Sequence, residues 1–152
     1  MNYVIDIQNA TAEKIPFTNI QIYKWIAQAL NNHEETAEIT VRIVNEEEIA
    51  ALNNNYRKNN KPTNVLAFPA EFPEHIELTI AFLGDIIICP TVLLKESQEL
   101  NKSLESHWAH IVIHGTLHLL GYDHIAEVDQ KIMQQYEISA LQALGFDNPY
   151  SD

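Results

Sequence analysis

Residues 103–121 are rich in large apolar side chains and contain histidines at a regular helical spacing. His110, His114 and His118 recur every four residues, and His107 extends the same stripe. Four residues rotate a helix by about 400° and advance it by about 6 Å, so these rings lie near one another on one face. Because most other positions are Trp, Ile, Val or Leu, the segment is predicted to be a buried helix. Buried imidazoles need partners for their nitrogens, and a metal ion satisfies several of them at once.

A second pattern, His-x3-His-x2-Gly-x2-His, is formed by His114, His118, Gly121 and His124. Two histidines one turn apart present nitrogens to one ion, and a glycine in a left-handed turn lets the third return to it. The metzincin zinc signature has this spacing, and three neutral imidazoles suit Zn²⁺ while leaving a fourth tetrahedral position open. A structural site closed by thiolates is disfavoured, because Cys89 is the only cysteine. We predict one Zn²⁺ per chain on a metzincin-like helix.

The remaining polar residues near this pattern are not needed as ligands. We expect His107 and His110 to support a ligand, face a substrate or pack in the core. Asp123 is expected to orient a ligand histidine or cap the turn, as carboxylates beside metal sites do. His33 and His75 are interpreted as ordinary surface residues.

The residue after the first ligand distinguishes this motif from that of zinc proteases. Those enzymes carry a glutamate there as the general base, whereas this chain has Gly115. The chemistry should therefore depend on positive charge more than on a carboxylate, as phosphodiester cleavage does. Gly115 is also explained as a small residue that allows close helix packing.

Charge is distributed unevenly along the chain. The formal net charge is −12, from 9 basic and 21 acidic residues, and such a surface repels nucleic acid and anionic membranes on average. Yet Arg57, Lys58 and Lys61 fall within five positions, flanking a Pro-Thr turn after the second predicted helix. Such a run is usually a solvated loop, but a positive spot beside a metal ion can hold a phosphate.

The pattern of elements predicts one α+β domain spanning residues 1–152, with a small mixed sheet of about four strands packed by about five helices. No apolar run is long enough to span a membrane, and neither a signal peptide nor a disulfide framework is present. These features indicate a soluble cytoplasmic protein. The expected strands are 3–7, 39–44, 64–68 and 82–89, and the expected helices are 18–30, 45 to about 52, 90–100, 103–121 and 126–144.

Four blocks of sequence resemble the YbeY family of bacterial endoribonucleases and rRNA maturation factors. They are 114–124, Tyr56-Arg57, 61–69 and 83–86, in the family's order. The resemblance implies a zinc-dependent, single-strand-specific endoribonuclease acting in 16S rRNA 3′-end processing, 30S subunit maturation and ribosome quality control. It also implies zinc ligation by His114, His118 and His124, a functional role for Arg57, and contact with a small-subunit ribosomal protein or the ribosome-associated GTPase Era. Family members commonly have Ser in place of Ala67 and often Asp in place of Asn64.

A mechanism based on the residues gives a role to each of the three clustered basic side chains. Arg57 neutralises the phosphoryl group at the transition state, while Lys58 and Lys61 guide the RNA backbone. Asp85 is either the proton acceptor or, more simply, a hydrogen-bond acceptor at a strand end. The nucleophile is water or the RNA 2′-hydroxyl group.

Two other functions fit the same residues. One is a metallohydrolase of peptidase type without the usual glutamate, and the other is a non-catalytic ribosome-assembly factor whose metal is structural. No DNA or membrane partner is expected for so acidic a chain. With a single small basic patch, free RNA should bind weakly, so a partner is expected to deliver the substrate.

Overall fold

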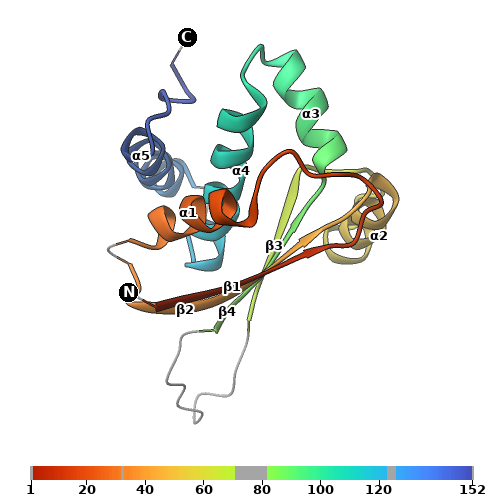
Figure 1. The fold of residues 1–152 in the computed structure, drawn as a ribbon, viewed down its shortest axis with the longest axis horizontal. Coiled ribbons are helices and arrows are strands. Elements are labelled where there is room, and N and C mark those ends of the chain that lie inside the picture. The colour runs from red at the N-terminus through yellow and green to blue at the C-terminus, as the bar shows by residue number, and fades with distance from the viewer. Residues whose placement is uncertain (1, 32, 71–81, 123–125, 152) are drawn as a thin grey trace.

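The fold is a mixed four-stranded sheet with helices on both faces (Figure 1). The computed structural model describes residues 2–31, 33–70, 82–122 and 126–151. Within these ranges the predicted α+β class, with four strands and five helices, is confirmed. The elements are β1 (Asn2–Asn9), α1 (Asn19–Leu30), β2 (Thr36–Ile43), α2 (Glu46–Arg57), β3 (Val65–Pro69), β4 (Phe82–Ile88), α3 (Pro90–Glu99), α4 (Leu104–Leu119) and α5 (Glu127–Ala143).

The strands lie in the order β1-β2-β4-β3. β1, β2 and β4 run parallel, whereas β3 pairs antiparallel with β4 and forms an edge of the sheet. Register places Ala67 opposite Ile86 and Phe68 opposite Asp85. Because side chains alternate along a strand, Ala67 and Phe68 point to opposite faces of the sheet.

Local sequence signals set the start of most helices. The side chains of Thr18, Asn45 and Ser103 accept hydrogen bonds from backbone N–H groups in the first turns of α1, α2 and α4. Pro90 opens α3, where its missing N–H is not needed. These starts agree with the sequence analysis.

The end of α2 differs from the prediction. The helix was expected to end near residue 52, but it continues to Arg57 and stops at Lys58, which has a left-handed backbone with φ of 60°. Asn53 is buried, and its side-chain amide donates to the Lys61 carbonyl oxygen at 2.9 Å. This contact ties the last turns of α2 to the following segment, so Arg57 is the last helical residue rather than part of a loop.

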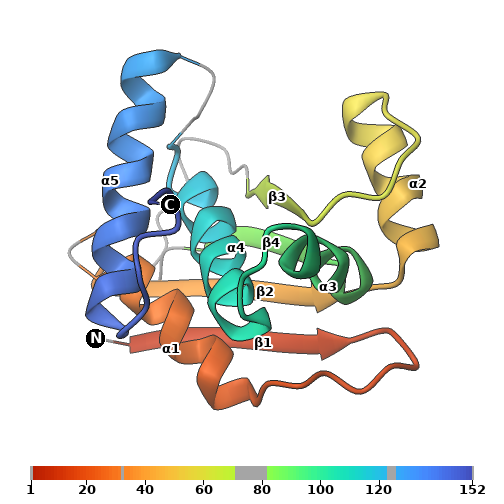
Figure 2. The ribbon, with the colours of Figure 1, turned by 90° about the horizontal axis from the view of Figure 1, so that it is seen from above.

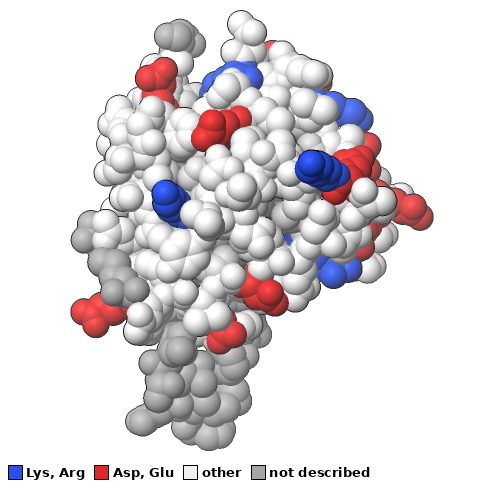
Figure 3. Space-filling model, viewed as in Figure 1, with Lys and Arg blue, Asp and Glu red and all other residues white. Residues whose placement is uncertain are grey.

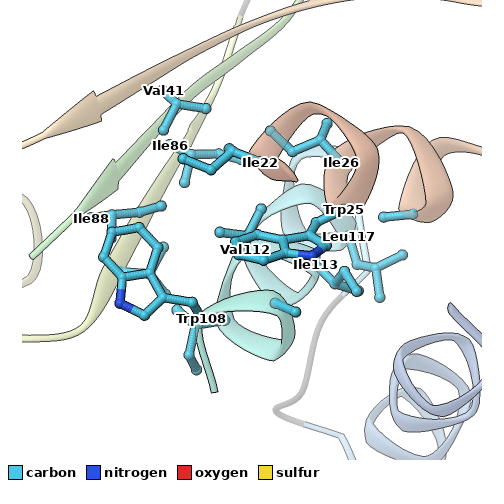
Figure 4. Close-up of a cluster of buried hydrophobic side chains, with 14 of the residues drawn as sticks. Ile22, Trp25, Ile26, Val41, Ile86, Ile88, Trp108, Val112, Ile113 and Leu117 are labelled. Atoms are coloured by element: carbon cyan, nitrogen blue, oxygen red, sulfur yellow. The ribbon is translucent and has the colours of Figure 1, made fainter. Parts of the chain in front are cut away.

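The main core lies between the sheet, α1 and α4 (Figure 4). It contains Trp25 from α1, Trp108 from α4 and Ile86 from β4, all nearly inaccessible to solvent. Burying each such side chain contributes about 1.5–3 kcal/mol, so this packing fixes α4 against the sheet. In Figure 1, α1, α4 and α5 lie on one side of the sheet and α2 lies on the other.

Gly115 marks the closest approach of α4 to the sheet. A Cβ atom at this position would lie 3.2 Å from Val65 Cγ2 and 3.3 Å from Ile86 Cγ2. The packing explanation for this glycine is therefore confirmed. The close contact brings the C-terminal half of α4 over β3, and this is where the histidine pair is found.

Candidate active site

His114 and His118 lie on the same face of α4 with their rings in contact. Their Nε2 atoms are 3.1 Å apart, the ring centroids are 4.6 Å apart, and both side chains are half-buried. Two imidazole nitrogens at zinc-ligand distances on a tetrahedral ion are about 3.3 Å apart. The two rings are thus already arranged as two ligands of one metal ion would be.

The third histidine of the predicted triad, His124, lies outside the described residues, as does Asp123. Gly121 does end the helix as predicted, with a φ of +102° that L-residues rarely adopt. The N–H of Tyr122 donates to the Leu117 carbonyl oxygen at 3.1 Å, which closes the helix terminus. Among residues 2–31, 33–70, 82–122 and 126–151, no three His, Cys, Asp or Glu side chains converge on a common metal position.

Glu137 of α5 is a buried carboxylate that holds His114 in place. It is 1% exposed, and Glu137 Oε1 lies 3.0 Å from His114 Nδ1. Glu137 Oε2 lies 3.0 Å from His110 Nε2, and the Tyr150 hydroxyl donates to the same oxygen at 2.7 Å. Burial by itself raises the pKa of Glu137, but hydrogen bonds and charge from His110 and His114 outweigh it and lower the pKa to about 2.

The ionised carboxylate determines which His114 nitrogen carries the proton. A carboxylate only accepts hydrogen bonds, so His114 Nδ1 donates to Glu137. The lone pair of His114 is then on Nε2, the atom that faces His118. Carboxylate–histidine pairs of this kind orient metal ligands and make them more basic.

Two further histidines of α4 bind carboxylates through their Nε2 atoms. His110 contacts Glu137, and also the Tyr150 hydroxyl at 3.2 Å. His107 is buried, and its Nε2 lies 2.9 Å from Glu96 Oε1. Burial lowers the pKa of His107, and the contact with Glu96 opposes this shift only in part. His110 shares Glu137 with His114, whereas His107 is a buried core residue paired with Glu96.

The prediction that His33 is an ordinary surface residue is wrong. His33 is half-buried, its Nε2 lies 2.9 Å from the Tyr122 hydroxyl, and its ring packs against Tyr136 with the centroids 4.8 Å apart. The sequence carried no local sign of these contacts, because the three residues come from separate elements. His75 lies outside the described residues.

Arg57 lines the same cavity as the histidine pair. The cavity has a volume of about 170 Å³ and lies between the end of α2, the start of β3 and the C-terminal half of α4. A guanidinium and two imidazoles around one small cavity form a site suited to an anion with tetrahedral oxygens, such as a phosphodiester. The lining residues are Arg57, Thr63, Asn64, Val65, Ala67, His114, Gly115 and His118.

The other candidate residues lie outside this cavity. Lys58 and Lys61 are exposed on the segment that follows α2 and are not among its lining residues. Asp85 is half-buried within β4, opposite Phe68 and Thr40, so it does not occupy a strand end as its simpler interpretation required. It does not line the cavity either.

The charged surface is fragmented. On the face shown in Figure 3, Lys and Arg side chains form small separate groups among acidic side chains rather than a continuous basic track. Among the described residues, Arg42 pairs with Glu48 and Lys95 pairs with Glu46. No helix of the described residues is long and apolar enough to cross a membrane.

Sequence reasoning missed Glu137 and Tyr150. The signal for Glu137 was its position on a stripe of α5 whose other buried members are Met133, Ala140 and Leu141. An acidic residue in such a stripe must find a buried partner. For Tyr150 there was no signal, because its contact depends on the path of the chain after α5.

Comparisons with known proteins identify the family of the chain. The family model described as Endoribonuclease YbeY matches residues 6–145. Proteins named Endoribonuclease YbeY from the Corby, Lens and Paris strains of Legionella pneumophila are each 55% identical to the chain over 150 residues, which is 99% of this chain and 95% of theirs. The solution structure of TM1509 from Thermotoga maritima shares the fold, with a TM-score of 0.59, 24% identity, and coverage of 93% of this chain and 92% of that one. By its sequence over nearly its full length, the chain belongs to the endoribonuclease YbeY family.

Proposed function

We propose that this protein is a zinc-dependent endoribonuclease that cleaves single-stranded RNA. Its biological substrate would be the 3′ end of 16S rRNA, during maturation of the 30S subunit and in ribosome quality control. The observation that carries the proposal is the small cavity shared by Arg57, His114 and His118. Membership of a family of endoribonucleases supports the reaction class.

Zinc fits the residues that are present. The Nε2 atoms of His114 and His118 converge to 3.1 Å, and Glu137 directs the His114 lone pair toward that point. We assign His124 as the third ligand from the spacing of the motif. When bound, Zn²⁺ supplies a Lewis acid for negative charge that develops on a phosphoryl oxygen.

The residues of the chain perform the remaining tasks. Arg57 stabilises the phosphoryl oxygens through its fixed fork of N–H donors as charge builds up. Glu137 keeps His114 in one tautomer and one orientation. Lys58 and Lys61 contact the RNA backbone next to the cavity, as exposed cations on the segment that follows α2.

The RNA product distinguishes two possible nucleophiles. Attack by the 2′-hydroxyl group leaves a 2′,3′-cyclic phosphate, whereas attack by water leaves a terminal phosphate and a free hydroxyl. Mass spectrometry of the cleaved ends identifies which chemistry the site performs.

Delivery of rRNA by a partner completes the proposal. A chain with a net charge of −12 and a few exposed cations near its site holds free RNA weakly. We propose that a small-subunit ribosomal protein or the GTPase Era brings the substrate to the cavity, in the cytoplasm.

The decisive experiment measures metal content and RNA cleavage on the same samples. Wild-type protein is expected to carry about one equivalent of zinc, and His114→Ala, His118→Ala and His124→Ala are expected to lose both metal and cleavage. Arg57→Ala should retain the metal and lose cleavage by about 100-fold or more. Arg42→Ala is the matched control, because Arg42 pairs with Glu48 away from the cavity, and it should retain both.

Other outcomes would favour the rival functions. Peptide hydrolysis that disappears in His118→Ala, without any RNA cleavage, indicates a peptidase. Unfolding of His124→Ala, together with an inactive wild type, indicates an assembly factor with a structural metal. Zinc below about half an equivalent in native protein argues against the metal assignment.

A further inference from the structure

An aromatic pair, the exposed Tyr56 and the half-buried Phe68, joins the end of α2 to the edge strand β3. Tyr56 directly precedes Arg57, which lines the cavity. Phe68 follows the cavity-lining Ala67 on β3 and points to the opposite face of that edge strand. The Tyr56 and Phe68 ring centroids are 4.6 Å apart, with the ring planes inclined at 76°. In Figure 2 the yellow end of α2 and the segment after it lead back to β3 at the edge of the sheet.

Phe68 anchors this pair while Tyr56 stays open to solvent. Phe68 is half-buried and packs against the smaller apolar cluster that includes Leu66 and Ile87. Tyr56 is 56% exposed, more than Tyr150, Tyr136 or Tyr23, the other exposed aromatic residues in the described part of the chain. A large, mostly exposed ring that is held by one aromatic neighbour offers contact area at little cost in conformational entropy.

The charge around this ring differs from that of the rest of the chain. No Asp or Glu occurs between residues 49 and 70, although the chain has 21 acidic residues. Within the described ranges, the side chains of Arg57, Lys58 and Lys61 make no ion pair, as is also true of Lys14, Lys24 and Lys102. An exposed ring among unpaired cations is suited to a ligand that is both anionic and aromatic.

We propose that Tyr56, supported by Phe68, is a stacking platform for an unpaired base of the RNA strand. The base belongs to a nucleotide next to the phosphate held at Arg57. This inference rests on the proposed function and deepens it. A base that stacks on Tyr56 must be free of its pairing partner and neighbours, so the platform gives a physical reason for preferring single strands.

Binding of a fluorescein-labelled single-stranded RNA of about 12 nucleotides tests the platform, with anisotropy read at low salt before gels detect cleavage. Tyr56→Ala should bind the RNA about 5- to 150-fold more weakly than wild type, whereas Tyr56→Phe, which keeps the ring, should bind nearly as well. Tyr23→Ala is the matched control, because Tyr23 is an exposed tyrosine on α1, and its affinity should equal that of wild type. The melting temperatures of all variants check that each one is folded.

A second RNA series shows whether the ring contacts a base. Single abasic sites are placed along the same RNA, and at one position the loss caused by Tyr56→Ala should disappear, because no base remains there to stack. Equal affinity of Tyr56→Ala and wild type would overturn the platform, as would a loss unaffected by every abasic site. If wild-type protein cleaves RNA and Tyr56→Ala binds RNA normally, only the stacking platform is rejected. If wild-type protein neither binds nor cleaves RNA, the proposed function is rejected.

Discussion

At the scale of single residues, Glu137 connects the histidine pair to the rest of the protein. The variant Glu137→Gln keeps the shape of the side chain but replaces one acceptor oxygen with an amide donor. Because the amide can present either its oxygen or its NH₂ group to His114 Nδ1, the tautomer and orientation of His114 are no longer fixed, and zinc affinity is expected to fall by about 10- to 100-fold. Competition with a chromophoric chelator measures this affinity without relying on catalysis.

Glu96→Gln is the control for that measurement. Glu96 of α3 contacts His107 of α4, so the substitution removes a similar carboxylate–histidine pair. Glu96 does not line the cavity, although it accepts hydrogen bonds from the side chain of Asn64, which does. Its zinc affinity should match that of wild type. Equal losses in the two variants would mean that Glu137 contributes to general stability and not to the position of His114.

His107 gives the protein a stability that depends on pH. Because burial lowers its pKa in the folded state, the unfolded chain takes up a proton near pH 6.5 that the folded chain does not. The contribution of neutral His107 is therefore present above pH 6.5 and is lost as the pH falls toward the folded-state pKa. Urea unfolding of wild type between pH 7.5 and about 5.5 should show a decline that is shallower in His107→Gln. Identical pH dependence in the two proteins would exclude this assignment.

The site could be predicted only where its residues are close in sequence. His114 and His118 are one helical turn apart, so spacing alone placed their rings together, and the structure confirms this contact. Arg57 was linked to the site through charge and family resemblance, and the cavity now brings it to the histidines. Glu137 lies 23 residues from His114, and its contact depends on how α4 and α5 pack, which no local pattern determines.

At the scale of elements, the close contact between α4 and the sheet limits what can replace Gly115. Gly115→Ala should be nearly neutral, because a gain in helix propensity of about 1 kcal/mol offsets the tight contact with Val65 and Ile86. Gly115→Val adds methyl groups where there is no room, and it should lower the free energy of unfolding by about 1–3 kcal/mol. Urea unfolding at equal metal content compares the two variants. A fully stable valine variant would show that α4 can move away from the sheet.

The helices and strands followed from local signals to a large extent. Alternation, caps and proline position predicted every element of the described chain, and most boundaries lie within a few residues of those expected. The exceptions have non-local causes. α2 runs on to Arg57 because the buried Asn53 side chain bonds to the Lys61 carbonyl oxygen, and that bond forms only once the following segment has folded back.

At the scale of the whole molecule, net charge controls how RNA is held. Three exposed cations near the site would neutralise about three phosphates, which gives a slope of about −2 for log affinity against log salt concentration on single-stranded RNA. Titrations of labelled RNA at several salt concentrations measure this slope. A slope steeper than about −4 would require a basic surface beyond Arg57, Lys58 and Lys61.

The Tyr150 hydroxyl reaches Glu137 from the segment that follows α5. Proteolytic loss of this segment during purification would remove a donor from the carboxylate that contacts His114 while sparing the segments that form the helices and the sheet. Preparations that contain such shortened chains would then have an unchanged circular dichroism spectrum and still differ in zinc affinity. An intact-mass measurement of each batch would reveal such trimming before any two preparations are compared.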